Sequence, residues 1–384
     1  MFNEFSQPAP IVFGAGSISI LGERVKALGC KTALCIYDKG VEDSKIASRA
    51  VKILIDAGID CITFNGVLAD PTDSIVDAAG DLAKATGADC LIGIGGGSSM
   101  DTAKATSILL DNPGPARKYI LPAPTFYDTK TPIFLIPTTS GTGSECTSVA
   151  IISIPDLNVK WSAFVNTTLA IVDPELTISL PKNVTVNSGL DAFAHAAEAI
   201  TGLNWNHHSD LFGEAAIRKI TRHLFTCYND PGNIEARSEL ALAANWAGLA
   251  FNNPITHVGH AMADAFSGHF HTPHGLNCAL ALPCTMEFVA PAVPEKMRTI
   301  ANAMELSLTG NETGEELGKA VAEGIWKMMR SMDMPSLKAM GYSREKVISF
   351  ASDVAASHLS GYSPVPVTEE VAAELLARVY DTYQ

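Results

Sequence analysis

Short runs of β-branched and apolar residues alternate with helical patterns through the first half of the chain, and this alternation limits the fold most strongly. It predicts buried strands at residues 32–38, 61–64, 89–94 and 132–136, and helices at about 44–57, about 72–86 and from about residue 100. Strands and helices that alternate in this way form a parallel sheet covered by helices on both faces. Ligands of such a sheet bind at the carboxyl ends of its strands.

The pattern changes after Leu169–Pro174. From Val186 onward the chain has helix-length runs rich in Ala, Leu and Met, with almost no candidate strands. A length of 384 residues leaves room for two domains, each with its own core. We therefore expect an α/β domain with a mostly parallel sheet at residues 1–180 and an all-α domain at residues 181–384.

Charge and composition limit the classes of binding partner that the chain can have. The net charge of −14 and a pI near 5.1 disfavour nucleic acid, because that affinity depends on clustered Lys and Arg. The first residues lack the order of a signal peptide, and no apolar run is long enough to span a bilayer. The eight cysteines form no C-x-x-C pair, so neither a thiolate zinc site nor a disulfide framework is indicated. We expect a cytoplasmic protein without membrane or nucleic-acid partners.

A glycine-rich turn follows the predicted strand at residues 89–94. Gly95, Gly96, Gly97 and Ser98 come directly before the next predicted helix, and Asp101 belongs to the same motif. Glycines here let the backbone approach a pyrophosphate, while the start of the helix offers unpaired N–H groups. These residues are candidate cofactor-binding residues. The alternative is a tight turn without a ligand.

A second loop follows the strand at residues 132–136 and is rich in glycine and hydroxyl side chains. Thr138, Thr139, Thr142 and Ser144 are its candidate cofactor-binding residues. Two such loops side by side would form a cradle for a diphosphate, which strengthens the interpretation of the glycine turn.

Asp38 ends the first of the predicted strands. A carboxylate at this position accepts hydrogen bonds from ribose hydroxyls and repels a 2′-phosphate, so it predicts NAD(H) as the cofactor. The alternative role is a helix or turn cap.

Histidines in the second half suggest a metal site. Asp191 and His195 are four residues apart in an Ala-rich helical pattern, so both side chains leave one helix face. The stretch from His260 to His274 holds four of the ten histidines. A carboxylate and imidazoles from separate segments suit a divalent metal. An Asp/His pair can also be a surface hydrogen bond, but these segments are apolar, and burying an unpaired imidazole is costly.

The order of these motifs resembles the iron-containing (group III) alcohol dehydrogenases. The carriers of the resemblance are Gly95–Lys104, Pro137–Glu145, the Asp191/His195 pair and the His260/His274 pair. It extends from Pro10–Gly16 through Asp173–Thr177 to about residue 285, and the helical tail beyond matches only in character.

The resemblance implies an α/β dinucleotide-binding domain and an all-α metal-binding domain, with the active site in the cleft between them and a dimeric assembly. It implies metal ligation by Asp191, His195, His260 and His274. It also implies that NAD(P) is bound by Asp38, Gly95–Ser98, Thr138, Thr139 and Thr142. Fe²⁺ is the ion expected from the family, and the residues themselves also suit Zn²⁺.

One position departs from the family. Many members carry a histidine where this chain has Asp264, four residues after His260 and on the same helix face. We expect Asp264 to act beside the metal without binding it, or alternatively to pair with a donor such as His257. His257 itself is expected to support the ligands or the fold. Cys278 either lines the site after His274 or is a buried, unreactive thiol.

The expected function is the reversible NAD(H)-dependent oxidation of a small primary alcohol or diol to its aldehyde. The alternative is a lyase of the dehydroquinate-synthase type, which would need cationic residues to hold its anionic substrate. Residues 187–200 and 256–280 contain no Lys or Arg, which disfavours the lyase. A metal-binding protein without catalysis would leave the two nucleotide loops unexplained.

Overall fold

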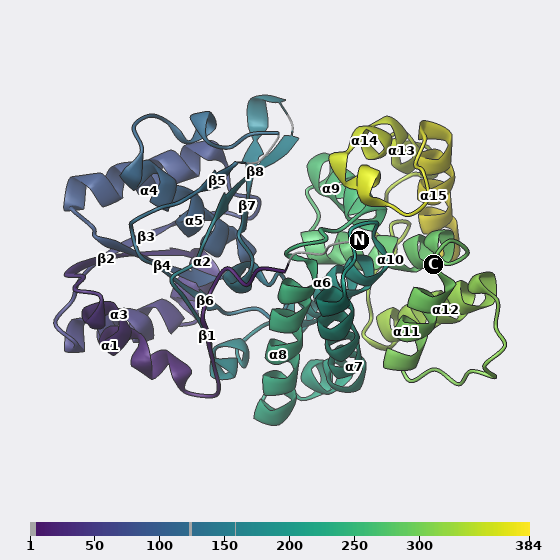
Figure 1. Ribbon diagram of the computed structural model, residues 1–384, viewed down its shortest axis with the longest axis horizontal. Coiled ribbons are helices and arrows are strands. Elements are labelled where there is room, and N and C mark those ends of the chain that lie inside the picture. The colour runs from purple at the N-terminus through teal and green to yellow at the C-terminus, as the bar shows by residue number, and fades with distance from the viewer. Residues whose placement is uncertain (1–4, 123–124, 158) are drawn as a thin grey trace. The chain divides into compact units, whose positions relative to one another are not determined.

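The computed structural model describes residues 5–122, 125–157 and 159–384. The chain divides into two compact units, with the boundary between Ser179 and Leu180 (Figure 1). The first unit comprises Gln7–Ser179, and the second comprises Leu180–Gln384 together with Phe5 and Ser6.

A six-stranded sheet in the order β1-β9-β6-β4-β2-β3 forms the centre of the first unit. Every neighbouring pair of its strands is parallel, which confirms the predicted architecture. The strands are β1 (Ile11–Phe13), β2 (Thr32–Asp38), β3 (Asp60–Val67), β4 (Cys90–Gly95), β6 (Ile133–Pro137) and β9 (Leu169–Val172).

Helices cover both faces of this sheet because alternate side chains of each strand point to opposite sides. On β2, Ala33 and Cys35 join one apolar core, whereas Leu34 and Ile36 join the other. The first core is completed by α1 (Leu21–Ala27) and α3 (Ile46–Asp56), and the second by α4 (Asp73–Thr86) and α5 (Gly97–Asp111). Figure 1 shows these two layers on either side of the strands.

Two details of the first unit differ from the prediction. The helix expected at about residues 44–57 is α3, but a short helix that was not predicted, α2 (Lys39–Asp43), precedes it, and Lys45 with its left-handed φ of 67° separates the two. Helix α5 begins at Gly97 rather than near residue 100, so part of the glycine turn is already helical.

A second, three-stranded sheet was not predicted. Its order is β5 (Phe126–Tyr127), β8 (Val159–Val165) and β7 (Val149–Ile154), and β7 pairs with β8 in antiparallel register. One face packs into the core through residues such as Ile152 and Ala163, while Ile151 on the other face is exposed. Such short, half-buried strands give a weaker sequence signal than the fully buried runs of β4 and β6.

The second unit is helical, as predicted, and no strand occurs among its described residues. Its helices are α6 (Lys182–Thr201), α7 (His207–Asn229), α8 (Ile234–Phe251), α9 (Val258–Phe270), α10 (His274–Val289), α11 (Pro294–Ala303), α12 (Gly314–Ser331), α13 (Arg344–Ile348), α14 (Ala351–Ala356) and α15 (Glu369–Thr382). None of the described helices is both long and apolar enough to cross a membrane.

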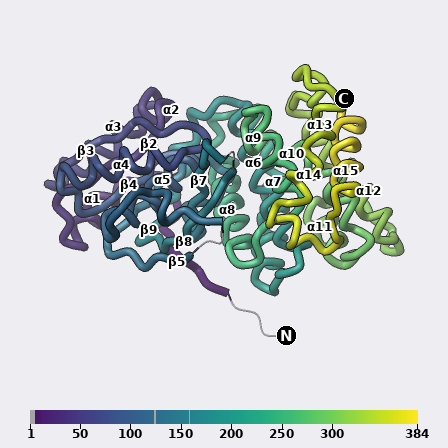
Figure 2. The backbone as a smooth tube through the Cα atoms, turned by 90° about the horizontal axis from the view of Figure 1, so that it is seen from above, coloured from purple at the N-terminus to yellow at the C-terminus, as the bar shows by residue number. Residues whose placement is uncertain are grey.

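Helix α6 packs against α7, α8 and α10 within this unit (Figures 1 and 2). From Gly189 to Thr201 every residue of α6 is buried. The small side chains of this segment, chiefly alanine, let neighbouring helices approach closely. Polar groups on this part of α6 therefore have no access to bulk water and must find partners inside the protein.

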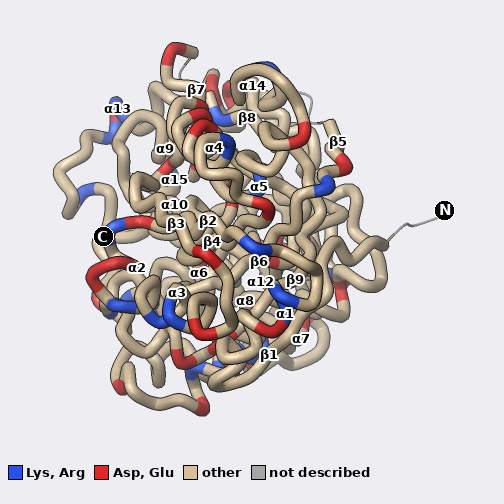
Figure 3. The backbone as a smooth tube through the Cα atoms, turned by 90° about the vertical axis from the view of Figure 1, so that its left-hand side faces the viewer, with Lys and Arg blue, Asp and Glu red and all other residues tan. Residues whose placement is uncertain are grey.

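Charged residues of both signs are interspersed along the chain. Figure 3 shows Lys and Arg scattered among the more numerous Asp and Glu, without a continuous basic tract along the trace.

Candidate active site

Three helices bring the four predicted metal ligands together in the second unit. Asp191 and His195 lie one turn apart on α6, His260 lies on α9, and His274 is the first residue of α10. The Oδ1 atom of Asp191 lies 3.9 Å from Nε2 of His195, 4.0 Å from Nε2 of His260 and 3.9 Å from Nε2 of His274.

These separations are too long for hydrogen bonds, but they suit a shared ion. Two nitrogen or oxygen ligands of one Zn²⁺-sized ion lie at most about 4.2 Å apart, since each bond is about 2.1 Å long. The three histidines thus present the same ring nitrogen toward one carboxylate oxygen at ligand-like distances.

The cluster also contains buried polar atoms that the described residues leave unsatisfied. Asp191 is 2% exposed and His260 is 5% exposed. Asp191 Oδ1 and His260 Nε2 have no hydrogen-bond partner within the described parts of the chain. Unsatisfied buried polar atoms are uncommon and costly, and a bound cation would satisfy both. The residues present therefore fit the predicted metal. His274 is the most accessible of the four, with a side chain 32% exposed.

Burial and neighbouring charges set the protonation of the cluster. Burial lowers the pKa of His195 to about 4, so this ring is neutral and its lone pair is available at neutral pH. For Asp191, burial would raise the pKa, but the surrounding imidazoles outweigh burial and lower it. The site therefore combines an ionised carboxylate with at least one neutral imidazole.

Glu198 holds His260 from behind, and the sequence analysis gave this residue no role. Oε1 of Glu198 lies 2.6 Å from Nδ1 of His260, and Oε2 accepts the backbone N–H of His257 at 2.7 Å. Burial would raise the pKa of Glu198, but His260 and His257 lower it to about 2. An ionised carboxylate at Nδ1 makes that nitrogen the donor and leaves the Nε2 lone pair facing the cluster. The sequence signal for Glu198 is its spacing of seven residues from Asp191, which places both side chains on the same face of an apolar helix.

Asp264 and His257, the two residues expected beside the metal ligands, lie in different places. His257 is fully buried behind His260, with Nε2 2.9 Å from Thr201 Oγ1 and Nδ1 3.4 Å from Glu198. Asp264 lies beside a predicted ligand, with Oδ1 3.7 Å from His274 Nδ1 and a side chain 36% exposed. The structure thus places Asp264 at the edge of the cluster and His257 beneath it.

Two glycines adjacent to the histidines allow the helices to meet. A Cβ atom on Gly275 would lie 2.3 Å from the backbone oxygen of Asn187, and one on Gly259 would lie 2.6 Å from Oε1 of Glu198. Both distances are far below van der Waals contact. The glycines next to His260 and His274 therefore set the close approach of α9 and α10 to α6.

The predicted cofactor loops lie against each other in the first unit. Gly95 has a φ of 147°, and a Cβ atom on Gly97 would lie 3.0 Å from the side chain of Thr142. Thr138 donates its backbone N–H to the oxygen of Gly95 at 2.9 Å. No side chain among the described residues caps the start of α5. The first turn of α5 is thus a suitable anion site beside hydroxyl groups of the second loop.

Asp101 and Ser144, both predicted to bind the cofactor, contact each other in the interior. Ser144 Oγ donates to Asp101 Oδ1 at 2.5 Å, and the backbone N–H of Ile151 donates to Oδ2 at 3.0 Å. The fully buried Lys104 lies 3.5 Å from the same carboxylate. This network ties the second loop and β7 to α5.

Asp38 lies at the end of β2, where its Oδ1 accepts the backbone N–H of Val41 at 2.9 Å and caps α2. The alternative role as a cap is therefore present in the structure. The side chain is only partly buried.

Comparison with known proteins assigns nearly the whole sequence to one protein family. Residues 8–174 match the family described as iron-containing alcohol dehydrogenase, and residues 185–380 match the C-terminal part of the Fe-containing alcohol dehydrogenase family. The chain belongs to the iron-containing alcohol dehydrogenase family. This membership confirms the resemblance drawn from the glycine loop, the hydroxyl-rich loop and the Asp/His pairs, and makes the chain an oxidoreductase.

Relatives within the iron-containing alcohol dehydrogenase family cover nearly the full length. A choline dehydrogenase of Bacillus subtilis (strain 168) is 32% identical, over 90% of this chain and 87% of that protein. An NAD-dependent methanol dehydrogenase of Bacillus methanolicus is 30% identical, over 98% and 99% respectively. The crystal structure of a 1,3-propanediol oxidoreductase superposes with a TM-score of 0.93 at 28% identity, covering 99% of this chain and 100% of that one.

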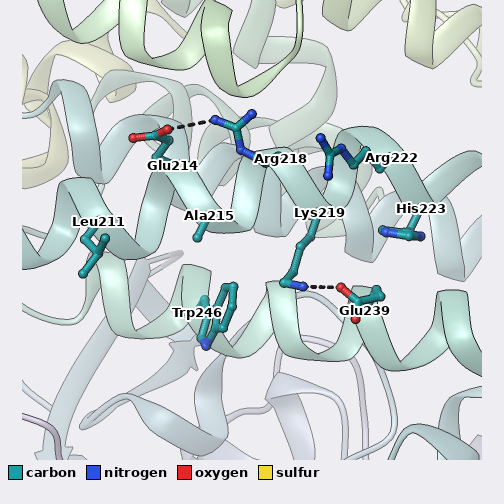
Figure 4. Close-up of a pocket in the computed structure, with 9 residues that line it drawn as sticks. All are labelled: Leu211, Glu214, Ala215, Arg218, Lys219, Arg222, His223, Glu239 and Trp246. Atoms are coloured by element: carbon teal, nitrogen blue, oxygen red, sulfur yellow. Dashed lines mark hydrogen bonds and ion pairs between the residues drawn. The ribbon is translucent and has the colours of Figure 1, made fainter.

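A surface cavity of about 300 Å³ between α7 and α8 is separate from the four candidate ligands (Figure 4). Its basic side chains are already paired with carboxylates. The pairs are Arg218 with Glu214, Lys219 with Glu239, and Arg222 with Glu305. These balanced charges give no reason to assign an anionic ligand to the cavity.

Proposed function

We propose that this chain is an NAD(H)-dependent dehydrogenase that interconverts a small primary alcohol or diol and its aldehyde. The observation that carries the proposal is the convergence of three imidazole nitrogens on one buried oxygen of Asp191. The names of the methanol dehydrogenase and the propanediol oxidoreductase support this reaction class. The lack of Lys and Arg at residues 187–200 and 256–280 speaks against the lyase alternative.

Asp191, His195, His260 and His274 would hold one divalent ion, for which the family favours Fe²⁺ and the donor set also suits Zn²⁺. When bound, such an ion supplies Lewis acidity toward the alcohol or carbonyl oxygen. Glu198 fixes the tautomer of His260, so that Nε2 remains an acceptor. His274 is more exposed than the other three ligands, so a substrate would reach the ion from the side of His274.

The cofactor residues would act through backbone N–H groups and hydroxyls. Gly95, Gly96, Gly97 and Ser98 would present the start of α5 to the pyrophosphate, while Thr138, Thr139 and Thr142 would line the facing loop. Position and electrostatics come from the protein, whereas the hydride chemistry belongs to the nicotinamide. We propose that Asp101 and Ser144 shape this cradle from the interior rather than contact the dinucleotide, because each already bonds to the other.

Asp264 is proposed to steady His274 or to pass a proton near the substrate. Its Oδ1 lies 3.7 Å from Nδ1 of His274, so a small side-chain rotation would let it accept a hydrogen bond that orients the ring. Asp264→Asn should lower kcat or metal affinity roughly tenfold, as changes beside metal ligands commonly do. A structural role would instead lower thermal stability and leave kcat per bound metal near that of the parent.

NADH oxidation with a panel of short aldehydes tests the function, using protein loaded separately with Fe²⁺ and with Zn²⁺. His260→Ala should lose turnover and bound metal but retain NADH binding in a fluorescence titration, since the cofactor loops belong to the other unit. His208→Ala, which changes an exposed histidine on α7, is the control and should retain all three. Equal metal content in His260→Ala and the parent would remove His260 from the ligand set.

A further inference from the structure

We propose that the sulfur of Cys278 is an additional donor at the metal site and shifts the site's affinity toward thiophilic divalent ions such as Zn²⁺, Co²⁺ and Cd²⁺, relative to Fe²⁺. The inference rests on the proposed metal site and adds a residue to it. It also decides between the two roles that the sequence left open for this cysteine, a residue lining the site and an unreactive thiol.

Cys278 lies one helical turn after His274 on α10, so both side chains leave the same face of that helix. Its Sγ lies 3.4 Å from Nε2 of His274. Ligand atoms of Asp191, His260, His274 and Cys278 all lie within 4.8 Å of one another. A sulfur and a nitrogen bound to one Zn²⁺ lie at most about 4.4 Å apart, so small side-chain rotations bring this set within bonding range.

The sulfur is also enclosed with the atoms that lack partners. Cys278 is 1% exposed, and its group includes Asp191 and His260, whose Oδ1 and Nε2 atoms have no hydrogen-bond partner in the described chain. These two atoms independently indicate a cation at this point. A cation held there would have the sulfur in its immediate surroundings.

The chemistry of the donor decides the preference. Oxygen and imidazole donors bind Fe²⁺ and Zn²⁺, whereas a thiolate favours Zn²⁺ and other thiophilic ions. On coordination, the S–H bond of Cys278 is exchanged for a sulfur–metal bond, and the proton leaves to the solvent. No oxidant or reductant takes part.

Cys284 provides a matched control on the same helix. It is also buried, but its Sγ lies 3.7 Å from the hydroxyl of Thr382, and it does not belong to the metal-ligand group of Cys278. A general effect of removing a buried thiol from α10 would therefore appear in both variants, whereas a ligand effect would appear only at Cys278.

The test is a Co²⁺ titration of the full-length, metal-free protein, followed by absorption spectroscopy. The parent and Cys284→Ala should show a near-ultraviolet sulfur-to-cobalt charge-transfer band, and Cys278→Ala should lose that band while keeping the visible bands of bound Co²⁺. In competition experiments, the affinity ratio of Cd²⁺ to Fe²⁺ should fall about tenfold or more in Cys278→Ala, a change typical of altered metal surroundings. Cys278→Ser preserves the side-chain volume and should show the same losses if the alanine variant folds poorly.

The outcomes separate this inference from the proposed function. If the parent binds Co²⁺ without the charge-transfer band, or if Cys278→Ala keeps the band, the sulfur is not a ligand and the inference is overturned, while the metal site stands. If the parent binds neither Co²⁺ nor Fe²⁺, the metal site itself is wrong.

Discussion

Two buried polar clusters, one in each unit, differ in whether the protein satisfies them. In the α/β unit, Lys104 is fully buried, and its Nζ donates to the backbone oxygens of Thr147 at 3.1 Å and Val149 at 2.6 Å. Asp101 accepts from Ser144 and from the backbone of β7 while lying near Lys104. The opposite charges compensate each other, and hydrogen bonds surround both.

In the helical unit, Asp191 is just as deeply buried, but its Oδ1 meets three imidazole nitrogens at distances too long for hydrogen bonds. Burial and charge are common to both clusters, so neither property marks a ligand site. The distinguishing feature is the unsatisfied atoms. Buried charges that have hydrogen-bond partners within the protein stabilise the fold. Several buried polar atoms without partners that face a common point indicate a binding site for a ligand.

The largest expected effect is in the satisfied cluster. Asp101→Ala leaves the Lys104 ammonium buried without its counter-charge, which should lower the free energy of unfolding by about 3–5 kcal/mol. Chemical denaturation of the metal-free protein measures this loss. The double variant Asp101→Ala/Lys104→Met should recover much of it, and no recovery would mean that the two charges do not compensate each other.

Glu198→Gln tests the cluster of the helical unit, because the carboxylate of Glu198 has hydrogen-bond partners and lies beside the unsatisfied atoms. Metal affinity should fall about 10- to 100-fold, as is typical when the partner of a ligand histidine is removed. Calorimetric titration of metal into parent and variant measures the ratio. An unchanged affinity would show that Glu198 does not orient His260.

The same variant has a pH signature. The pKa of Glu198 is lowered from 4.5 to about 2 in the folded protein. Its stabilising contribution is therefore complete above about pH 4.5 and is lost as the pH falls through about 2. Acid unfolding of the parent should be steeper in this window than that of Glu198→Gln, and identical acid profiles would contradict the low pKa.

Asp38 belongs to neither cluster, and its substitution should have the smallest effect. One of its oxygens caps α2, and the partly buried carboxylate is proposed to select against the 2′-phosphate of NADP. Asp38→Gly should improve kcat/KM for NADP relative to NAD by several-fold, on the order of 1 kcal/mol at a partly exposed site. If the parent already uses both cofactors equally, Asp38 does not contact the ribose.

Sequence reasoning succeeded where local spacing determines geometry. The parallel strands follow from continuous apolar runs between helical patterns, and the shared face of Asp191 and His195 follows from their separation of four residues. The convergence of His260 and His274 on that face could not be derived from spacing, since it depends on close approaches at Gly259 and Gly275. It came instead from the family resemblance.

The features that were missed depend on tertiary neighbours. Glu198 lies three residues after His195 on α6, but its role becomes visible only when α9 brings His257 and His260 against that helix. The place of Asp101 after the glycine turn predicts a cofactor residue, and its interior partners, which come from β7 and from the loop after β6, cannot be found from spacing. The small second sheet that supplies β7 was itself absent from the prediction.

The central claim is that Asp191 belongs to a cluster completed by a metal, and the most direct measurement is the unfolding of metal-free and metal-loaded Asp191→Asn beside the parent. Without metal, the variant should be no more stable than the parent, because the imidazoles that lower the pKa of Asp191 also stabilise the charge that the variant removes. Metal at 100 times its Kd should stabilise the parent by about 2.7 kcal/mol and leave the variant unchanged. The claim would be contradicted by a parent that does not respond to metal, or by a variant that metal stabilises as much as it stabilises the parent.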